Sequence, residues 1–397
     1  MFIALYFLSL FTLTFLQNRK EIFSSPEIKK NYSVSVLIPA FNEEESIEGT
    51  IESILKSKYK NLLEIIIIND GSSDNTLKIA KQLEKKYSNV KVFDKKNSGK
   101  ADSLNQALKI AKGELVAIVD ADSFPDQESL STMIGYFEDE KVGAVTTRIL
   151  VRNKNNFLRR MQAIEYKVIA FTRKMLGFLD SIYVTPGPLA LYRKSALKKI
   201  KGFDPKNMTE DIEATWHLIH DGYKIRMSFI SKVTTVAPDT LKKWFTQRIR
   251  WNIGGYQTIL KYKHCFFRKG ILGIFILPLF SISLVLGVFG LGFFTYRIST
   301  RILSSYLSTK YSIAAQTAVF ALNDVNLNPS ILNFLGVILF ILGLSFVFFA
   351  LRLINKHIKE KENFFSVIFY LLVYIVLRPV VLIVSLYKFS RGKYSWR

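Results

Sequence analysis

The stretch that decides the fold is Ile65–Asp74, with the sequence IIIINDGSSD. Four consecutive isoleucines predict a buried β-strand, because a strand that is covered on both faces is apolar throughout. The polar residues that follow end the strand, and Asp74 is expected to cap the next helix. A strand followed by a turn and a helix begins a βαβ unit, so this stretch predicts a parallel sheet.

The neighbouring sequence repeats the same pattern. We expect strands at Val34–Ile38, Glu64–Ile68, Val90–Phe93 and Leu115–Val119, and helices at Glu43–Lys56, Asn75–Tyr87 and Ser98–Ala111. This alternation predicts an α/β fold with a mostly parallel central sheet and helices on both faces. Ligands of such sheets bind beyond the carboxyl ends of the strands, so polar residues at those ends are the candidate site.

Apolar runs divide the chain into three regions. Residues 1–19 contain a short run, Phe2–Leu16, which we interpret as a membrane anchor; the alternative is a hydrophobic helix packed against other spans. Residues 20–268 are expected to form a cytoplasmic domain that ends in an interfacial amphipathic helix. Residues 269–397 are expected to form transmembrane helices, with long apolar runs at Ile271–Tyr296, Ile331–Leu351 and Phe364–Tyr387.

The charge of the chain points to a lipid bilayer as its partner. The 397 residues carry a formal net charge of +23. Much of this charge flanks the apolar runs, at Lys261–Lys269 and Lys356–Lys361, and basic flanks favour the cytoplasmic side. We therefore expect no nucleic-acid partner. Three full spans would leave the basic C-terminus outside, so either the third run is re-entrant or the tail is an exception.

Arg378 and Pro379 interrupt the third apolar run. An Arg and a Pro at membrane depth are costly unless they face protein or a water-filled path. Two interpretations stay open. Either the span is kinked and Arg378 extends towards the interface, or the helix breaks and lines a channel.

Few residues are available for soft metal ligation. The chain has one cysteine, Cys265, which excludes an internal disulfide and a thiolate cluster, and its four histidines argue against a histidine-rich metal site.

Two carboxylates follow the strand in VAIVDADS, Val116–Ser123. Asp120 and Asp122 are two residues apart, and such a pair repels unless a cation neutralises it. Mg²⁺ or Mn²⁺ suits this pattern, because such an ion takes one or two carboxylates together with substrate phosphate oxygens. The sequence thus predicts a divalent cation that stabilises a diphosphate leaving group.

Three further strand ends or helix starts carry candidate residues. In VLIPAFNEE, Val36–Glu44, the strand runs into a Pro turn, and Phe41 and Glu43 either frame a nucleotide or simply begin a helix. Asp70 can accept a hydrogen bond from a base or ribose. Lys100, in NSGKAD, can meet a phosphate at a helix start, although the spacing is not that of a Walker A loop.

Two motifs in the second half suit an acceptor. In MTED, Met208–Asp211, Asp211 is a candidate general base; the alternative is a helix start capped by Thr209. In WFTQRIRW, Trp244–Trp251, helical spacing puts three side chains on one face, where they can clamp a diphosphate and stack on a sugar, or simply form an interfacial belt. These three side chains are Gln247, Arg250 and Trp251.

Taken in order, the six motifs resemble those of membrane-bound family 2 glycosyltransferases, and most of all the processive polysaccharide synthases that make cellulose, hyaluronan, chitin and poly-N-acetylglucosamine. The resemblance covers roughly Val34 to Gly255. It implies a GT-A fold, a divalent cation, a nucleotide-sugar donor and an inverting mechanism. One departure is Asn69, which stands where many members have Asp.

The resemblance also implies roles for single residues. Nucleotide and donor contacts fall to Phe41, Glu43, Asp70, Lys100 and Asp120. Asp122 would be the metal ligand and Asp211 the catalytic base, while Gln247, Arg250 and Trp251 match the Gln-x-x-Arg-Trp motif of processive synthases. The segment Gly187–Arg193 resembles the acceptor side, which favours a carbohydrate acceptor.

From this resemblance we expect an enzyme that extends a polysaccharide at the cytoplasmic membrane face, from UDP-N-acetylglucosamine or UDP-glucose, processively and with export. Because the N-terminal span is single and short, an accessory membrane subunit or a second copy would complete a conduit. The alternative is transfer of one sugar to a polyprenyl phosphate or another lipid. A transporter or scaffold with a degenerate domain would have lost the carboxylates, which are all present.

Overall fold

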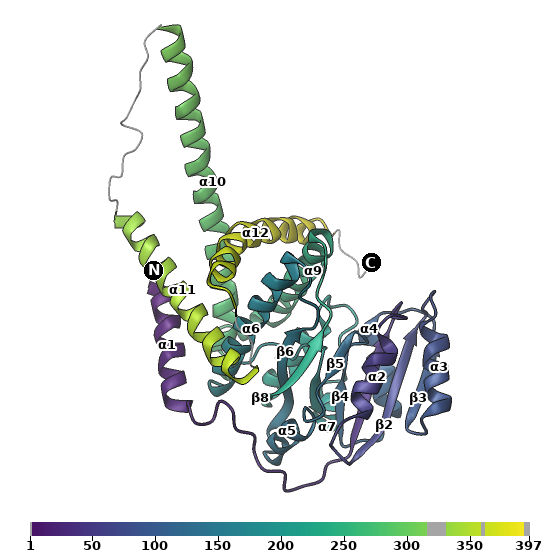
Figure 1. The fold of residues 1–397 in the computed structure, drawn as a ribbon. Coiled ribbons are helices and arrows are strands. Elements are labelled where there is room, and N and C mark those ends of the chain that lie inside the picture. The colour runs from purple at the N-terminus through teal and green to yellow at the C-terminus, as the bar shows by residue number, and fades with distance from the viewer. Residues whose placement is uncertain (1, 316–330, 359–361, 393–397) are drawn as a thin grey trace.

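The computed structural model describes residues 2–315, 331–358 and 362–392. It contains one eight-stranded sheet, with a group of long helices packed at one side of it (Figure 1). The strands are β1 (Val34–Ala40), β2 (Leu62–Asp70), β3 (Val90–Lys95), β4 (Leu115–Ile118), β5 (Ser123–Pro125), β6 (Val142–Val151), β7 (Ala190–Arg193) and β8 (Lys224–Thr235).

The strand order is β3-β2-β1-β4-β7-β6-β8-β5. The four strands at the β3 end are mutually parallel, as are β6 and β8, whereas β7 runs antiparallel between β4 and β6 and β5 runs antiparallel to β8. All four strands expected from the sequence are present, and the sheet is mostly parallel as predicted.

Helices cover both faces of the parallel half. The helices of this half are α2 (Ile47–Leu55), α3 (Thr76–Lys86) and α4 (Lys100–Ile110), close to the expected ranges. Successive strand side chains point to opposite faces. In β2, Ile66 therefore packs in the core that contains α4, and Ile67 packs in the core that contains α2. This division accounts for the unbroken isoleucine run.

Two local predictions at the start of α2 are wrong. Pro39, where a turn was expected, is still part of strand β1. Strand β4 pairs with β1 only as far as Leu37, so the missing N–H of Pro39 costs no hydrogen bond on the β4 side of the strand. The helix starts at Ile47 and not at Glu43. The amide of Glu43 donates instead to Thr76 Oγ1 at 2.7 Å, which ties the end of β1 to the start of α3.

The second half of the soluble part carries six more helical segments. They are α5 (Ser131–Ile134), η1 (Gly135–Glu138), α6 (Phe157–Phe178), α7 (Lys194–Lys199), α8 (Glu210–His220) and α9 (Leu241–Tyr262), followed by a 3-10 turn, η2 (Lys263–Cys265). Helices α6 and α9 lie between the sheet and the membrane-type helices (Figure 1).

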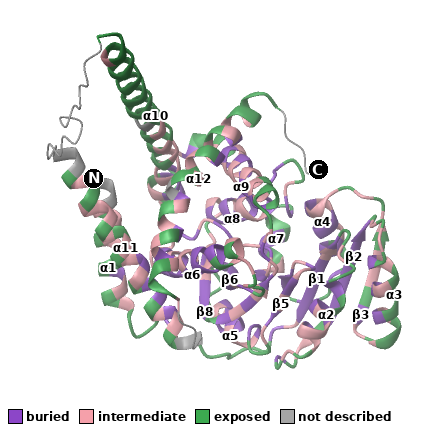
Figure 2. Cartoon of the chain, turned by 45° about the horizontal axis from the view of Figure 1, so that its top comes forward, coloured by how far each residue is buried: buried purple, intermediate pink, exposed green. Residues whose placement is uncertain are grey.

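Three helices among the described residues are long and apolar enough to cross a membrane. They are α10 (Leu277–Ala314, preceded by a π-helical turn, Leu272–Ile276), α11 (Ile331–Ile358) and α12 (Phe364–Ser390). Much of α10 beyond the base that packs on the domain is exposed in Figure 2. The apolar runs predicted from the sequence thus appear as helices.

The N-terminal helix α1 (Phe2–Asn18) is shorter than these three. Its aromatic side chains pack against α11, with ring centroids 5.9 Å apart for Phe11 and Phe346 and 4.7 Å apart for Phe15 and Phe349. This packing is compatible with both interpretations, a short membrane anchor and a hydrophobic helix packed against a longer span.

The third apolar run forms one continuous helix, because α12 continues through Pro379, so of the two open interpretations the helix break is not found. A proline inside a helix removes one backbone hydrogen bond and kinks the helix without ending it where the surrounding packing holds both sides. Helix α12 bends as it lies over α9 and α6 (Figure 1).

Candidate active site

A cavity of about 970 Å³ opens where the strand ends meet α6, α8 and α9, and it extends to α10 and α12. All ten side chains predicted from the sequence line it: Phe41, Glu43, Asp70, Lys100, Asp120, Asp122, Asp211, Gln247, Arg250 and Trp251. The structure therefore gathers six motifs, from Phe41 to Trp251 in the sequence, around one cavity.

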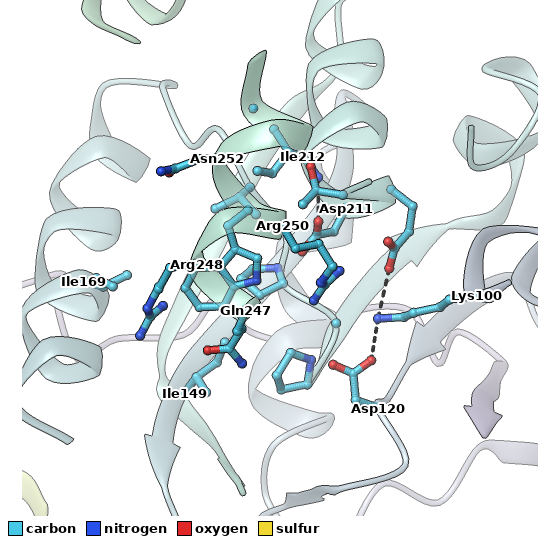
Figure 3. A pocket seen from close by; sticks show the side chains of 18 of the residues that line it. Lys100, Asp120, Ile149, Ile169, Asp211, Ile212, Gln247, Arg248, Arg250 and Asn252 are labelled. Carbon is cyan, nitrogen blue, oxygen red and sulfur yellow. Dashed lines mark hydrogen bonds and ion pairs between the residues drawn. The ribbon is translucent and has the colours of Figure 1, made fainter. Parts of the chain in front are cut away.

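Lys100 lies at the centre of the charged wall. Its Nζ is 2.5 Å from Asp120 Oδ1 and 2.9 Å from Glu210 Oε1, as the dashed lines in Figure 3 show. Burial lowers the pKa of Lys100, but the charges of Asp120, Glu210 and Asp211 outweigh it and raise the pKa above its ordinary value. Lys100 is therefore a permanent cation facing the space in which a phosphate would be bound.

The loop that carries Gly187 covers this ion pair. The amide of Asp120 donates to the carbonyl of Gly187 at 3.0 Å. A Cβ on Gly187 would lie 2.5 Å from Lys100 Nζ and 2.6 Å from Asp120 Oδ1. Only glycine lets the backbone approach this closely, which connects the segment Gly187–Arg193 to the charged wall.

Asp70 supports a neighbouring loop in addition to lining the cavity. It accepts hydrogen bonds from Lys95 Nζ at 2.6 Å and from the amides of Ser98 and Gly99 at 2.9 Å each. Burial raises the pKa of Asp70, but these donors together lower it below its ordinary range. The carboxylate thus holds the loop before α4, and with it Lys100, while it also lines the cavity.

Two carboxyls on the other side, Glu43 and Asp122, lack a comparable cation among the described residues. Burial, with the charges of Asp122 and Asp120, raises the pKa of Glu43 to about 7. Burial and the charge of Asp120 raise the pKa of Asp122 to about 6, although Ser123 and Thr235 donate hydroxyl hydrogen bonds to its Oδ1. A divalent cation offsets the repulsion between neighbouring carboxylates. This set of oxygen ligands therefore fits Mg²⁺ or Mn²⁺.

These carboxyls do not form a closed three-ligand cage in the part of the chain that the structure describes. That is compatible with Mg²⁺, which keeps open positions for water and substrate phosphates. Both carboxylates use Oδ1, Asp122 towards the hydroxyls of Ser123 and Thr235 and Asp120 towards Lys100, so only Asp120 is engaged by a cation.

Asp211 lies at the start of α8, beside Glu210. Burial and the charge of Glu210 raise the pKa of Asp211 to about 6. The predicted cap by Thr209 is wrong: its hydroxyl donates to Asn207 Oδ1 at 3.3 Å and makes no cap bond. Thr209 instead packs against Gly254 of α9. A Cβ on Gly254 would lie 2.0 Å from Thr209 Oγ1, so α8 and α9 can approach this closely only because residue 254 is a glycine.

The predicted face of α9 points into the cavity. Gln247, Arg250 and Trp251 all line it, and Figure 3 shows Gln247 and Arg250 on the side that faces Lys100 and Asp120. Arg250 Nη1 also donates to the carbonyl of Met208 at 3.2 Å, which links this helix to the MTED segment.

A buried charge cluster in the wall was missed in the sequence. Glu165 of α6 pairs with Arg248 of α9 and accepts a hydrogen bond from Tyr374 at 2.8 Å; its second oxygen is 3.5 Å from Arg378. Arg248 lies over the ring of Trp251 at 4.1 Å. Of the charged residues in this cluster, the sequence pattern had pointed only to Arg378. Glu165 was missed because a single acidic residue in an amphipathic helix gives no signal.

Several buried polar atoms in the wall have no hydrogen-bond partner among the described residues. They are Glu210 Oε2, Gln247 Oε1, Arg248 Nε and Nη1, Arg173 Nε, Trp244 Nε1 and Tyr256 Oη. Buried polar groups are normally paired, so these donors and acceptors are available to water or to a polar ligand in the cavity.

Comparison with known proteins places these observations in context. A profile described as "Glycosyl transferase family 2" matches residues 35–201. The poly-beta-1,6-N-acetyl-D-glucosamine synthase of Staphylococcus epidermidis is 30% identical over 366 residues, 91% of this chain and 84% of that protein. The synthase of the same name from Staphylococcus aureus (strain COL) is 35% identical over 246 residues, 62% of this chain and 59% of that protein, so the alignment spans less than two thirds of this relative's length.

A solved structure agrees on the fold. The mannosyltransferase PcManGT from Pyrobaculum calidifontis, in complex with GDP-Man and Mn²⁺, superposes with a TM-score of 0.52 at 20% identity, covering 64% of this chain and 72% of that one. At this identity the likeness concerns the fold alone, and it confirms the expected GT-A architecture.

Proposed function

The chain is a member of glycosyl transferase family 2, and on that premise we propose that it adds N-acetylglucosamine from UDP-N-acetylglucosamine to a growing polysaccharide at the cytoplasmic face of a membrane. The observation that carries this proposal is the single cavity in which Lys100, the Asp120/Asp122 pair and Asp211 face the same space as unpaired polar atoms of α6, α8 and α9. The names of the relatives support N-acetylglucosamine over glucose.

In the donor half, Lys100 and the amide-rich start of α4 would bind the diphosphate, while Phe41, Glu43 and Asp70 would border the nucleoside. Asp122, with Asp120 and Glu43 nearby, would hold Mg²⁺ or Mn²⁺. A divalent cation bound there supplies charge neutralisation for the departing diphosphate.

In the acceptor half, Asp211 would accept the proton of the attacking hydroxyl. The hydroxyl oxygen forms a bond to the anomeric carbon as the bond from that carbon to the diphosphate oxygen breaks, so the sugar inverts and nucleoside diphosphate leaves. A pKa raised to about 6 suits this task, because the carboxylate is ionised at neutral pH and still basic enough to bind the proton.

The unpaired polar atoms would bind the glycan. Sugar hydroxyls and an acetamido group can pair with the oxygen of Gln247 and the guanidinium of Arg248, and Trp251 can stack on a ring. The continuation of the cavity to α10 and α12 supports a path for a growing chain towards the membrane.

The decisive experiment is a radiolabelled-sugar assay on the full-length protein in lipid, with a panel of UDP- and GDP-sugars, with Mg²⁺, Mn²⁺ or EDTA, and with size analysis of the product. We expect a large polymer from UDP-N-acetylglucosamine, lost in EDTA. A label found only in lipid-extractable material would replace polymer synthesis by transfer to a lipid carrier.

The Asp122→Asn variant tests the metal assignment in the same assay. Loss of the carboxylate charge should raise the Mn²⁺ concentration needed for half-maximal rate on the order of tenfold or more. The matched control is Asp126→Asn, whose carboxylate is outside the cavity and pairs with Lys232 at 3.2 Å on the surface. An unchanged Mn²⁺ titration in Asp122→Asn would remove this residue from the site.

A further inference from the structure

A second group of metal-ligating side chains lies outside the cavity. The ligand atoms of His220, His264 and Cys265 all lie within 4.8 Å of one another. Among the described residues, no other group of three or more metal-ligating side chains has this geometry. The two histidine rings are 6.0 Å apart at an interplanar angle of 69°. Because His220 is distant in sequence from the adjacent pair His264 and Cys265, the sequence did not indicate this site.

We propose that His220, His264 and Cys265 form a zinc site that fastens the end of α8 to the turn between α9 and the first span-length helix. Two imidazole nitrogens and one thiolate are a ligand set that selects Zn²⁺ over the hard cations Mg²⁺ and Mn²⁺. This site is chemically distinct from the carboxylates of the cavity, and the proposal does not depend on the proposed function.

The surroundings of the three side chains support the assignment. His220 Nδ1 lies 3.2 Å from Asp221 Oδ1, an interaction that holds the proton on Nδ1 and leaves the lone pair of Nε2 for a metal. Metal-binding histidines commonly donate their second ring N–H to a carboxylate in this way. Cys265 is fully buried and is a free thiol.

The access and the spacing are also suitable. His264 is exposed and His220 is partly exposed, so an ion can reach the group from solvent. Tetrahedral bonds of about 2.0 to 2.3 Å bring ligand atoms to about 3.3 to 3.7 Å from one another. The side chains therefore need to close by at most about 1 Å, which small rotations of the three side chains can supply. The fourth position would be left to water.

The position gives the site a structural consequence. His220 is the last residue of α8, and the first two residues of that helix are Glu210 and Asp211. A metal at the far end would anchor the helix that carries the candidate base. The pairing of Lys261 with Glu213 at 2.7 Å already joins α8 to α9 nearby, so the metal would add a second connection.

The test uses the full-length protein without a polyhistidine tag, in detergent or lipid, stripped of metal and kept reduced, with Mg²⁺ in excess. Zn²⁺ is titrated against a chromophoric chelator, and Co²⁺ serves as a spectroscopic substitute. We expect one high-affinity Zn²⁺ per chain, a thiolate-to-Co²⁺ charge-transfer band with tetrahedral d–d bands, and a higher thermal unfolding midpoint with Zn²⁺.

The variants separate a metal site from ordinary packing. Cys265→Ser should abolish the charge-transfer band, and His264→Gln, at an exposed position that folding tolerates, should weaken Zn²⁺ binding on the order of 100-fold. Asp221→Asn should weaken it about 10- to 100-fold and keep the band, since it only orients His220.

His217→Gln is the matched control, because His217 contacts the same Tyr262 ring but is outside the three-ligand group. It should bind Zn²⁺ like the wild type. A wild-type protein without stoichiometric Zn²⁺, a Cys265→Ser protein with an unchanged spectrum, or equal losses in His217→Gln and His264→Gln would each overturn the proposal.

Discussion

At the residue scale, Glu210 and Asp211 are adjacent in the chain but have opposite pKa shifts. Burial raises the pKa of Glu210, but the charges of Lys100 and Arg250 lower it below its ordinary value. Asp211 feels the same burial together with the negative charge of Glu210, and its pKa is raised. Two neighbouring carboxyls with separated pKa values are suited to separate tasks, one as an ion-pair partner and one as a proton acceptor.

The Asp211→Asn variant should lose transfer but keep the donor. The amide has the same shape and no basicity, so we expect kcat to fall by about 10²- to 10⁴-fold with donor affinity nearly unchanged. Initial rates and UDP-sugar binding by calorimetry check this. Asp126→Asn, on the surface, should behave as wild type; turnover of Asp211→Asn close to that level would contradict the assignment.

The pH profile should report the same carboxyl. A raised pKa means that Asp211 becomes protonated as the pH falls through about 6, and the protonated acid cannot accept a proton. We therefore expect kcat, measured at saturating donor and metal, to be constant above this range and to decline below it. A rate that stays level down to pH 4.5 (about the ordinary range of a carboxyl) would be inconsistent with Asp211 as the base.

At the scale of elements, Glu165 connects three helices. It lies on α6, pairs with Arg248 on α9 and contacts Tyr374 and Arg378 on α12, and its side chain is 4% exposed. Removing one partner of a buried ion pair leaves the other charge uncompensated, whereas an exposed pair is largely replaced by water. The junction between the catalytic domain and the membrane-type helices therefore depends on this carboxylate.

Glu165→Gln should lower the free energy of unfolding by about 3–5 kcal/mol. Its control is Glu128→Gln, which breaks the exposed Lys58–Glu128 pair of 2.6 Å and should cost at most about 1 kcal/mol. Denaturant unfolding of both variants in the same detergent gives the comparison. Similar costs in the two variants would show that the Glu165 cluster contributes no more than a surface pair.

At the scale of the whole molecule, the cavity belongs to the soluble and the membrane-type parts at once. Its wall continues from the strand ends to Phe280 and Leu284 on α10 and to Arg378 and Leu382 on α12. Arg378 lines this cavity, but its side chain is 62% exposed and the helix around it is unbroken, so a helix break is not what brings this residue to the cavity. A cation at this depth is tolerated where it faces such a space.

Arg378→Leu should impair polymer formation more than donor hydrolysis. The substitution removes a cation from the end of the cavity that reaches α12 and leaves the donor half unchanged, so, if the glycan passes there as proposed, we expect a several-fold drop in long product with hydrolysis nearly retained. Size analysis of the product and release of UDP, measured on the same samples, separate the two effects. Equal losses of both would indicate a purely structural role for Arg378.

The sequence by itself determined the four parallel strands at one end of the sheet and the candidate residues. These features are local patterns: the Ile65–Ile68 run, the polar strand ends and the apolar runs. A strand buried on both faces is apolar throughout, and so is a helix in a bilayer, so both can be recognised from the residues of the segment alone. The first four strands and the ten cavity residues followed from such patterns.

Only the tertiary structure decided how these residues meet. The pairing of Lys100 with Glu210, the support of Asp70 by the loop before α4, the Glu165 cluster and the approach of His220 to Cys265 join segments that are 20 to more than 200 residues apart. Such contacts leave no periodic trace, because each depends on where two elements pack and not on the residues around either partner. The continuity of α12 through Pro379 has the same origin: packing against α6 and α9 holds a helix that local propensity would end.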